Sequence, residues 1–359
     1  MSELRELDVK VLENAIFLPG NARGGGVISS EGDYQPSSYT SRCFAEARKY
    51  DYEEVLLEHS DEEVICLGIV NPCWGHCLTD SLKFLWVRFS DRHSLRNIKN
   101  LKFVYAMQYP NQVLPDNFLG VLSRLGIPET RLVKVTKPTR FKRIYLPEEC
   151  FWHEPGRGRF FTIEYEHLLD VLTSGLRKGQ DRKIYLTRSR WRGRTIDYGE
   201  TQIAEYFHAI GYEVISPELV PFSEFLSMMA NCSVLAATEG SIAHNAVFLR
   251  KGARIVLLRK SKWSNDYQRA INVARHLDVL YIDANRTWLV NPKTPWEGPF
   301  FLYVSPALRA WGGEVKCMFP YGQYVMYLLE ILCMKAFRFM RLVYAQRRNL
   351  EKILKRGIV

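Results

Sequence analysis

The chain has 359 residues, of which 47% are hydrophobic and 25% charged, a composition typical of globular proteins that excludes a disordered chain. Its length is sufficient for two compact domains. The formal net charge is +10, but from Lys335 to the end there are eight basic residues and one acid, Glu351. The remainder is close to neutral, which argues against a nucleic-acid binder with basic charge spread over its body.

The first 180 residues are predicted to form an irregular α/β domain. Short strands are expected at Val9–Leu18 and Gly26–Ser29, around the glycine cluster at 24–26. The other predicted strands are Val64–Val70, Lys102–Met107, Arg131–Val135 and Arg143–Leu146, and the predicted helices are Gly75–Phe89, Asp116–Leu125 and Ile163–Leu176. The polar segment Arg177–Arg182 is expected to link this domain to the next.

Residues 181–300 are predicted to form a second, Rossmann-like domain, because apolar β-branched runs alternate there with helix-period segments. The predicted strands are Lys183–Thr187, Tyr212–Ser216, Ser233–Ala237, Arg254–Leu258 and Leu280–Asp283, and the predicted helices are Glu200–Ile210, Phe222–Ala230, Ser241–Leu249 and Asp266–His276. Strands that alternate with helices in this way predict an open parallel sheet with helices on both faces.

Residues 301–359 are predicted to form a crossover segment and a long amphipathic helix. The segment Asn285–Trp311 is rich in Pro, Trp and Gly and predicts an irregular wrap over the surface, and a helix resumes at Gly322. In residues 336–359 an apolar stripe opposes a basic one, a pattern typical of a helix at an anionic membrane surface. Packing of the apolar stripe on the protein is the alternative, and we favour it for Gly322–Lys335.

The cellular location is predicted from absent signals. No basic stretch followed by an apolar core is visible at the N-terminus, and charged residues interrupt the most apolar candidate span, Tyr321–Val343. Eight cysteines show no paired framework, which favours reduced thiols. We therefore expect a cytoplasmic protein, peripheral on the inner face of the membrane if residues 336–359 bind lipid.

Two strand ends in the second domain carry groups that suit a phosphate, and ligands of open parallel sheets bind beyond the carboxyl ends of strands. Arg188 and Arg190 follow the first strand, where Arg can form paired hydrogen bonds to phosphate oxygens. The residues that follow the third strand are Glu239, Gly240, Ser241, His244 and Asn245. A Gly-Ser turn that opens a helix presents backbone N–H groups to an anion, although Ser241 can equally be a simple N-cap. No GxGxxG or Walker A motif is present, which disfavours dinucleotide enzymes and P-loop ATPases.

The first domain contributes a His and an Asp four residues apart. On a helix, His76 and Asp80 share a face. The pair can act as a general base, with the proton taken by His76 or by Asp80 itself, or it can be a hydrogen bond that only rigidifies the helix. Cys73 and Cys77 lie beside His76, but no second cluster completes a zinc site, so no metal is expected.

These motifs resemble glycosyltransferase family 61. The family's "GH…DSL" helix corresponds to residues 75–82 (GHCLTDSL), its "Y(L/I)xR" motif to residues 185–188 (YLTR), and its "HGAGLTN"-like turn to residues 239–245 (EGSIAHN). The glycine-rich stretch at 23–27 is similar to one near the start of such proteins. The resemblance covers roughly residues 20 to 285, with three motifs in the same order.

The resemblance implies a GT-B architecture, in which two Rossmann-like domains face each other across a cleft. It also implies inverting transfer from a nucleotide-sugar, usually a UDP-sugar, with no obligatory metal, as in capsular polysaccharide biosynthesis. The donor would bind the C-terminal domain through Arg188 and residues 240–245, and the acceptor, a glycan or glycolipid, would bind the N-terminal domain. His76 or Asp80 would deprotonate the acceptor hydroxyl. Nucleic acid is not an expected partner.

Glu239 is a departure from the family pattern, because the family has His at this place. A carboxylate beside a diphosphate would repel it unless it faces a sugar hydroxyl or Arg188. This leaves a second hypothesis, that the chain is a catalytically degenerate protein that only binds a nucleotide-sugar or a glycan.

Overall fold

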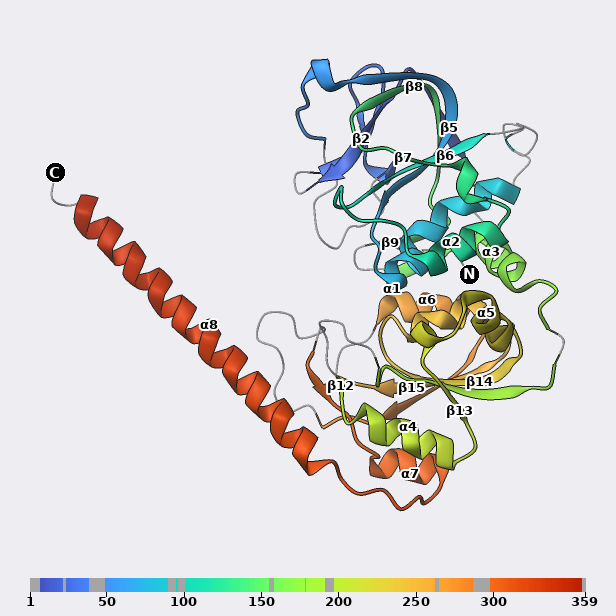
Figure 1. Ribbon diagram of the computed structural model, residues 1–359, viewed down its shortest axis with the longest axis vertical. Helices are drawn as coiled ribbons and strands as arrows, with labels where there is room; N and C mark the ends of the chain where they lie inside the picture. Colours follow the sequence, from blue (N-terminus) through green and yellow to red (C-terminus); the bar gives the residue numbers. More distant parts are fainter. Residues whose placement is uncertain are drawn as a thin grey trace.

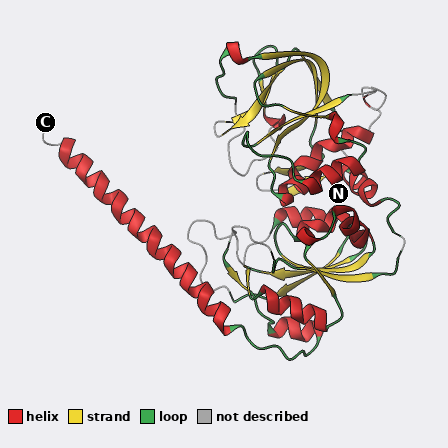
Figure 2. Ribbon diagram, in the orientation of Figure 1, coloured by secondary structure: helices red, strands yellow, loops and turns green. Residues whose placement is uncertain are grey.

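A computed structural model gives the fold of the chain (Figures 1 and 2). The residues that it describes are 7–21, 24–38, 49–89, 95, 101–154, 158–177, 179–190, 197–261, 265–286 and 298–356. Two α/β halves lie one above the other in Figure 1, and a long C-terminal helix extends from the second half.

The N-terminal half is built on an eight-stranded mixed sheet with the order β4-β3-β2-β8-β5-β6-β7, in which β1 also pairs with β8. The strands are β1 (Val9–Glu13), β2 (Ile16–Asn21), β3 (Gly24–Ile28), β4 (Tyr34–Gln35), β5 (Glu58–Val70), β6 (Lys102–Met107), β7 (Leu132–Lys134) and β8 (Thr139–Pro147). β5 runs parallel to β6 and β8, and β6 runs parallel to β7, whereas the other pairs are antiparallel. The single β segment predicted at Val9–Leu18 is two strands, because the chain turns at Asn14, which has a φ of 51°.

This half also contains helices. They are α2 (Asp116–Arg124), α3 (Ile163–Thr173) and the short 3-10 helices η1 (Pro36–Ser38), η2 (Glu54–Leu56) and η6 (Glu129–Arg131). The helix predicted at Gly75–Phe89 is instead three joined pieces: α1 (Trp74–His76), the π-helical η3 (Cys77–Ser81) and the 3-10 helix η4 (Leu82–Phe89). The Thr79 hydroxyl donates to the Gly75 carbonyl at 2.9 Å and competes with the regular backbone bond of an α-helix at that carbonyl. A hairpin of β9 (Phe151–Glu154) and β10 (Gly158–Phe161) adds to this half.

The C-terminal half contains the parallel sheet that the sequence predicts. Its order is β13-β11-β14-β15-β16, and every neighbouring pair is parallel. The elements are β11 (Arg182–Leu186), α4 (Glu200–Ala209), β13 (Glu213–Ile215), η7 (Pro217–Leu219), α5 (Phe222–Ala230), β14 (Cys232–Thr238), β15 (Arg254–Arg259), α6 (Asp266–Ala274) and β16 (Asp278–Asp283). Because β11 is flanked by β13 on one side and β14 on the other, the strand order reverses between β11 and β14, which is where ligands of such sheets bind.

The helix predicted at Ser241–Leu249 is shorter and tighter than expected. It is the 3-10 helix η8 (Ala243–Phe248), and residues 239–242 form a turn in which the Ala243 N–H donates to the Gly240 carbonyl at 2.9 Å. The Asn245 side-chain amide donates to the Ile242 carbonyl at 2.8 Å, a local bond that competes with α-helical pairing. The predicted helix N-terminus at Ser241 is therefore a turn.

The two halves pack through their helices rather than through their sheets (Figure 1). α2 and α3 of the first half contact α5 of the second, and η3 and α3 contact η8. One hydrophobic cluster runs without interruption across this interface, from Leu78 and Val121 in the first half to Leu235 and Val247 in the second. This shared core fixes α1 and η3 against the turn that follows β14.

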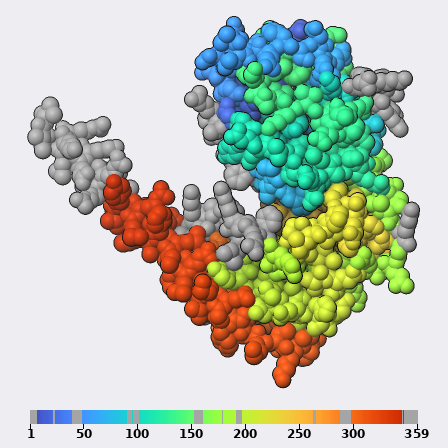
Figure 3. All heavy atoms as spheres, viewed as in Figure 1, coloured from blue at the N-terminus to red at the C-terminus, as the bar shows by residue number. Residues whose placement is uncertain are grey.

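The last segment wraps the second half and then leaves it. β12 (Asp197–Tyr198) pairs with β17 (Phe300–Phe301), α7 (Pro306–Gly312) follows, and α8 (Tyr321–Arg356) is a single helix that projects from the body (Figures 1 and 3). The irregular wrap predicted at Asn285–Trp311 thus contains β17 and α7; residues 287–297 lie outside the described ranges. At its start α8 is held by Tyr327 and Ile331, which are buried against Phe301. None of the helices in the described ranges combines the length and the apolar character that crossing a bilayer requires.

Candidate functional site

A buried carboxylate shapes the turn after β11. One oxygen of Glu200, Oε1, accepts hydrogen bonds from the Tyr185 hydroxyl at 2.8 Å, the Thr187 hydroxyl at 3.0 Å and the Arg188 N–H at 3.1 Å. Burial, followed by the negative charge of Asp197, raises the pKa of Glu200 to about 7. Glu200 therefore fixes the backbone of Arg188 at the edge of the sheet where the strand order reverses.

Two cationic side chains meet at this edge around one carboxylate. Arg188 Nη1 lies 3.6 Å from Asp197 Oδ2, and Lys260 Nζ lies 3.1 Å from the same oxygen. Asp197 and Lys260 are both buried, and Lys260 also lies 4.9 Å from the centre of the Phe300 ring. Taken alone, these three side chains carry one formal positive charge, and because those of Asp197 and Lys260 are buried, they would attract an anion more strongly than exposed groups would.

The turn after β14 approaches this cationic group. Gly240 has a φ of 121°, and a Cβ built there would lie 3.7 Å from Lys260 Nζ, so the Lys260 ammonium lies against the Gly240 backbone. The neighbouring Glu239 is 8% exposed. Burial raises the pKa of Glu239 to about 7, although the charges of Arg259 and Lys260 act in the opposite direction. A neutral Glu239 can donate a hydrogen bond and does not repel an anion.

The His76–Asp80 pair predicted from the spacing is present. His76 Nδ1 lies 2.6 Å from Asp80 Oδ2, and the side chains are 18% and 7% exposed, respectively. Because the partner of Nδ1 is a carboxylate, we assign the proton to Nδ1, which places the lone pair on Nε2. The irregular α1–η3 helix keeps the pair on one face, as a regular helix would.

The pair lies directly beside the turn that follows β14. A Cβ built on Gly75 would lie 2.7 Å from Ser241 Oγ and 3.1 Å from His244 Nδ1, so only glycine permits this approach. The Trp74 indole N–H donates to Asn245 Oδ1 at 2.9 Å, a second link between the two segments. The first half and the second half therefore build one site.

An aromatic residue joins the two histidines of this site. The Tyr267 ring, on α6, lies 6.4 Å from the His76 ring in an edge-to-face arrangement and 6.1 Å from the His244 ring. Tyr267 also stacks with Phe151, with 6.1 Å between the ring centres. Tyr267 thus contacts both the His76–Asp80 pair and the turn of residues 239–245.

Most of the residues predicted for the site are brought together, and some members were missed. Among the predicted residues, Arg190 is exposed in the turn at 189–190 and makes none of the described contacts with the cationic group. Lys260 was missed, although it immediately follows β15 at the same edge of the sheet as Arg188. Its position shortly after a predicted strand could have identified it as a candidate. Asp197 and Glu200 carried no such signal, because they follow no predicted strand.

The described residues offer no arrangement suited to a metal ion: no three His, Cys, Asp or Glu side chains cluster within the described ranges. The seven cysteines in those ranges are free thiols, and burial raises the pKa of the Cys77 thiol. The Cys77 thiol therefore stays protonated at neutral pH, and it is a poor nucleophile and a poor metal ligand.

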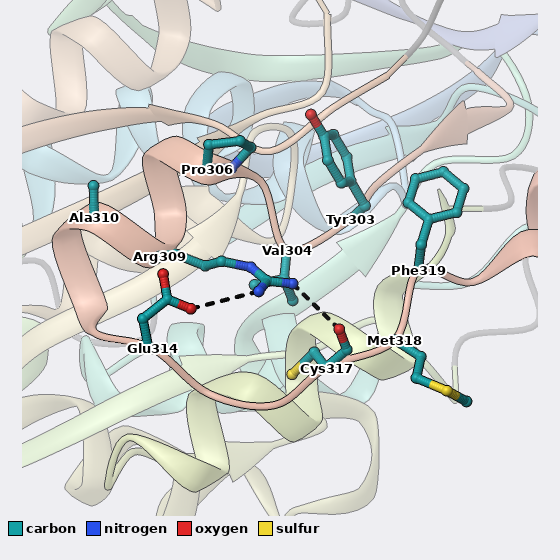
Figure 4. A pocket seen from close by; sticks show the side chains of 9 residues that line it. All are labelled: Tyr303, Val304, Pro306, Arg309, Ala310, Glu314, Cys317, Met318 and Phe319. Carbon is teal, nitrogen blue, oxygen red and sulfur yellow. Dashed lines mark hydrogen bonds and ion pairs between the residues drawn. The ribbon is translucent and has the colours of Figure 1, made fainter.

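A separate hollow lies between α7 and the segment that follows it (Figure 4). Its volume is about 400 Å³, and nine residues between Tyr303 and Phe319 line it. Its cation, Arg309, lies 3.5 Å from Glu314 and donates to the Cys317 carbonyl at 3.2 Å. Because its charged groups are already engaged with each other, this hollow is a weaker candidate site than the one around Gly75.

A comparison with known protein families matches the part of the chain that contains the site around Gly75. The family model described as Glycosyltransferase 61 matches residues 74–256, about half of the chain. The match begins at Trp74, includes the His76–Asp80 pair and the turn of residues 239–245, and ends within β15. The search of curated proteins gave no match.

Proposed function

The chain belongs to glycosyltransferase family 61, and we propose that it moves a sugar from a nucleotide-sugar, most simply a UDP-sugar, to a hydroxyl group of a glycan or glycolipid acceptor. The observation that supports this most directly is the approach of Gly75 to Ser241. It places a His–Asp pair, which can take a proton, next to a cationic edge that can hold a diphosphate. Transfer of a sugar from a diphosphate to a hydroxyl needs these two elements side by side.

On the donor side, Arg188 and Lys260 bind the diphosphate in this proposal. In the structure both cations lie beside Asp197 at the edge of the sheet where the strand order reverses, which is where ligands of such sheets bind. The Gly240 backbone lies against Lys260, so a phosphate can approach the turn closely. These cations stabilise the charge that develops on the departing nucleoside diphosphate. Because they supply that charge, the proposed reaction has no obligatory metal.

On the acceptor side, His76 Nε2 takes the proton of the acceptor hydroxyl, and Asp80 holds the imidazole and stabilises the imidazolium that forms. The hydroxyl oxygen bonds to the anomeric carbon of the donor while the bond from that carbon to the phosphate oxygen breaks. Because attack occurs opposite to the leaving diphosphate in one displacement, the configuration at the anomeric carbon inverts. Direct proton transfer to Asp80 is the alternative route.

Glu239 fits the same reaction once its pKa is considered. With a pKa of about 7, much of Glu239 is protonated at neutral pH. A neutral carboxyl beside Lys260 can donate to a sugar hydroxyl or a phosphate oxygen. The residue that departs from the family pattern is thus compatible with an anionic donor.

The finer architecture that we propose is GT-B, with residues 1–180 binding the acceptor, 181–300 binding the donor, and 301–359 as crossover and terminal helix. It is supported by the presence of parallel strands in both halves and by a candidate site that both halves build. We place the activity in the cytoplasm, in the synthesis of a polysaccharide such as a capsule.

The test measures turnover and donor binding separately. Purified protein is incubated with nucleotide-sugars and a panel of acceptors, and release of nucleoside diphosphate is followed. His76→Gln and Asp80→Asn should each lower kcat by about 10²- to 10⁴-fold while donor affinity stays unchanged. His208→Gln, an exposed histidine on α4, is the control and should keep full activity.

The same assay decides the alternative hypothesis. If the wild-type protein binds a nucleotide-sugar but neither transfers nor hydrolyses it with any acceptor in the panel, the chain is a degenerate binding protein. If His76→Gln and His208→Gln have equal activity, the assignment of the base is wrong.

A further inference from the structure

α8 carries a continuous line of exposed apolar side chains along its length. The large side chains of this line are Tyr321, Val325, Leu329, Leu332, Phe339 and Val343. Neighbouring members are three or four residues apart, except that Leu332 and Phe339 are seven apart with Ala336 between them. The large side chains in it are 48% to 73% exposed. A globular protein normally buries such a stripe, so this one calls for a partner.

The opposite face of the same helix changes character along its length. Near the body it is apolar, with Tyr327 and Ile331 buried against Phe301. Farther along the helix, where it has left the body, the same face carries Lys335, Arg338 and Arg341, which follow Ile331 at spacings of three to four residues and are all exposed. Packing on the protein therefore accounts for the Tyr327 face, but it leaves the side chains of the line from Tyr321 to Val343 exposed.

The charge of this region indicates the kind of partner. Between Ile331 and Leu350 the sequence has five basic residues and no acidic one. A second copy of the helix would bring these like charges together, whereas an anionic lipid surface would neutralise them. Phe337 and Tyr344 add exposed aromatic rings on the flank of the helix, and Arg341 lies 6.0 Å from the centre of the Phe337 ring. Such rings suit the boundary between headgroups and acyl chains.

We propose that α8 is a membrane-docking helix, which lies in the headgroup layer of an anionic bilayer with the line from Tyr321 to Val343 turned toward the acyl chains. Lys335, Arg338 and Arg341 then reach the lipid phosphates with their long side chains. With 36 residues at about 1.5 Å per residue, α8 is roughly 54 Å long and offers this surface well beyond the body. The inference does not depend on the proposed transferase activity.

The test uses the full chain and lipid vesicles. Cosedimentation is measured with vesicles of phosphatidylcholine alone and with vesicles that also contain phosphatidylglycerol. The stripe variant carries Leu332→Ser, Phe339→Ser and Val343→Ser. The matched control carries Val55→Ser, Val113→Ser and Leu219→Ser, which are exposed apolar residues on the body. Circular dichroism establishes that each variant keeps its helix content.

The proposal predicts that the wild-type chain and the control bind the anionic vesicles, and that the stripe variant binds them at least about tenfold more weakly. Raising the salt concentration should also weaken wild-type binding. Equal binding by the stripe variant, or no wild-type binding to anionic vesicles, overturns the proposal. So does light scattering that shows a wild-type dimer and a monomeric stripe variant, because a second copy would then cover the stripe.

Discussion

Replacing Gly75 by alanine tests whether the two halves build one site. The new Cβ would lie 2.7 Å from Ser241 Oγ, 3.0 Å from Ser241 Cβ and 3.1 Å from His244 Nδ1. Ordinary contacts of a Cβ begin near 3.4 Å, so the two segments must separate by roughly half an ångström. Overpacking of this kind costs about 1–3 kcal/mol. A net loss of about 1–3 kcal/mol is therefore expected, because the helix-interior preference of alanine has little effect in the three-residue α1.

The free energy of unfolding is measured by urea denaturation, followed by tryptophan fluorescence. Ser241→Gly removes two of the three atoms that the new Cβ would meet. In that background Gly75→Ala should cost at least about 1 kcal/mol less than in the wild-type chain. Gly322→Ala in α8, where a Cβ would meet nothing within 4 Å, is the control and should be neutral or stabilising.

The comparison of Gly75→Ala in the two backgrounds can also show that the contact is absent. If Gly75→Ala leaves the unfolding free energy unchanged, or if its cost is the same in the wild-type chain and in the Ser241→Gly background, the segments do not touch as described. If they do touch, the variant should also lower turnover by about 10²-fold, because a shift of this size misplaces the base relative to the donor.

Three further predictions concern buried polar groups of the site. Trp74→Phe removes the donor to Asn245 Oδ1 and should cost about 1–3 kcal/mol in urea unfolding, because Asn245 is buried; a cost near zero would contradict the contact. Glu200 has a pKa of 4.5 in the unfolded chain and about 7 in the folded protein, so its protonated form favours folding and stability should fall as pH rises between these values, by up to about 3 kcal/mol. Glu200→Gln should reduce this fall in urea unfolding between pH 5 and pH 8, while the part that comes from Glu239 remains; an unchanged difference between the two pH values would count against it. Glu239 ionises near the same pH, so wild-type affinity for a UDP-sugar should decrease from pH 6 to pH 8, whereas Glu239→Gln should show no such decrease in titration calorimetry; parallel pH profiles would argue against a carboxyl beside the donor.

The parallel sheet of the second half was predictable because each strand is a short apolar run between helix-period segments. The bounds of α5 agree with the predicted ones, and those of β11 and β15 lie within one residue of them. β5 shows that a strand cannot be predicted from apolar residues where it is polar. Its first half, Glu58–Glu63, is polar and lacks the apolar alternation of a strand, yet it pairs with β8, so only Val64–Val70 was predicted.

In the candidate site too, some contacts follow from local sequence spacing and others depend on tertiary packing. The His76–Asp80 contact follows from a four-residue spacing, and it survives the change from an α-helix to α1 and η3. The approach of Gly75 to Ser241 joins residues that are far apart in the chain, and it depends on how α1 packs against the turn after β14. No local pattern encodes that packing. The same applies to Asp197, which becomes part of the site through contacts with Arg188 and Lys260.

Binding of a nucleoside diphosphate at the Arg188–Lys260 edge is the central claim, and calorimetric titration with UDP, GDP and dTDP tests it most directly. The wild-type chain should bind one of the nucleotides, and Arg188→Ala should weaken that binding by about 10- to 100-fold through loss of a charge-assisted hydrogen bond. Arg177→Ala, which removes an exposed arginine before β11, should bind as the wild-type chain does. No binding of any of these nucleotides to the wild-type chain, or equal affinities for the two variants, would contradict the claim.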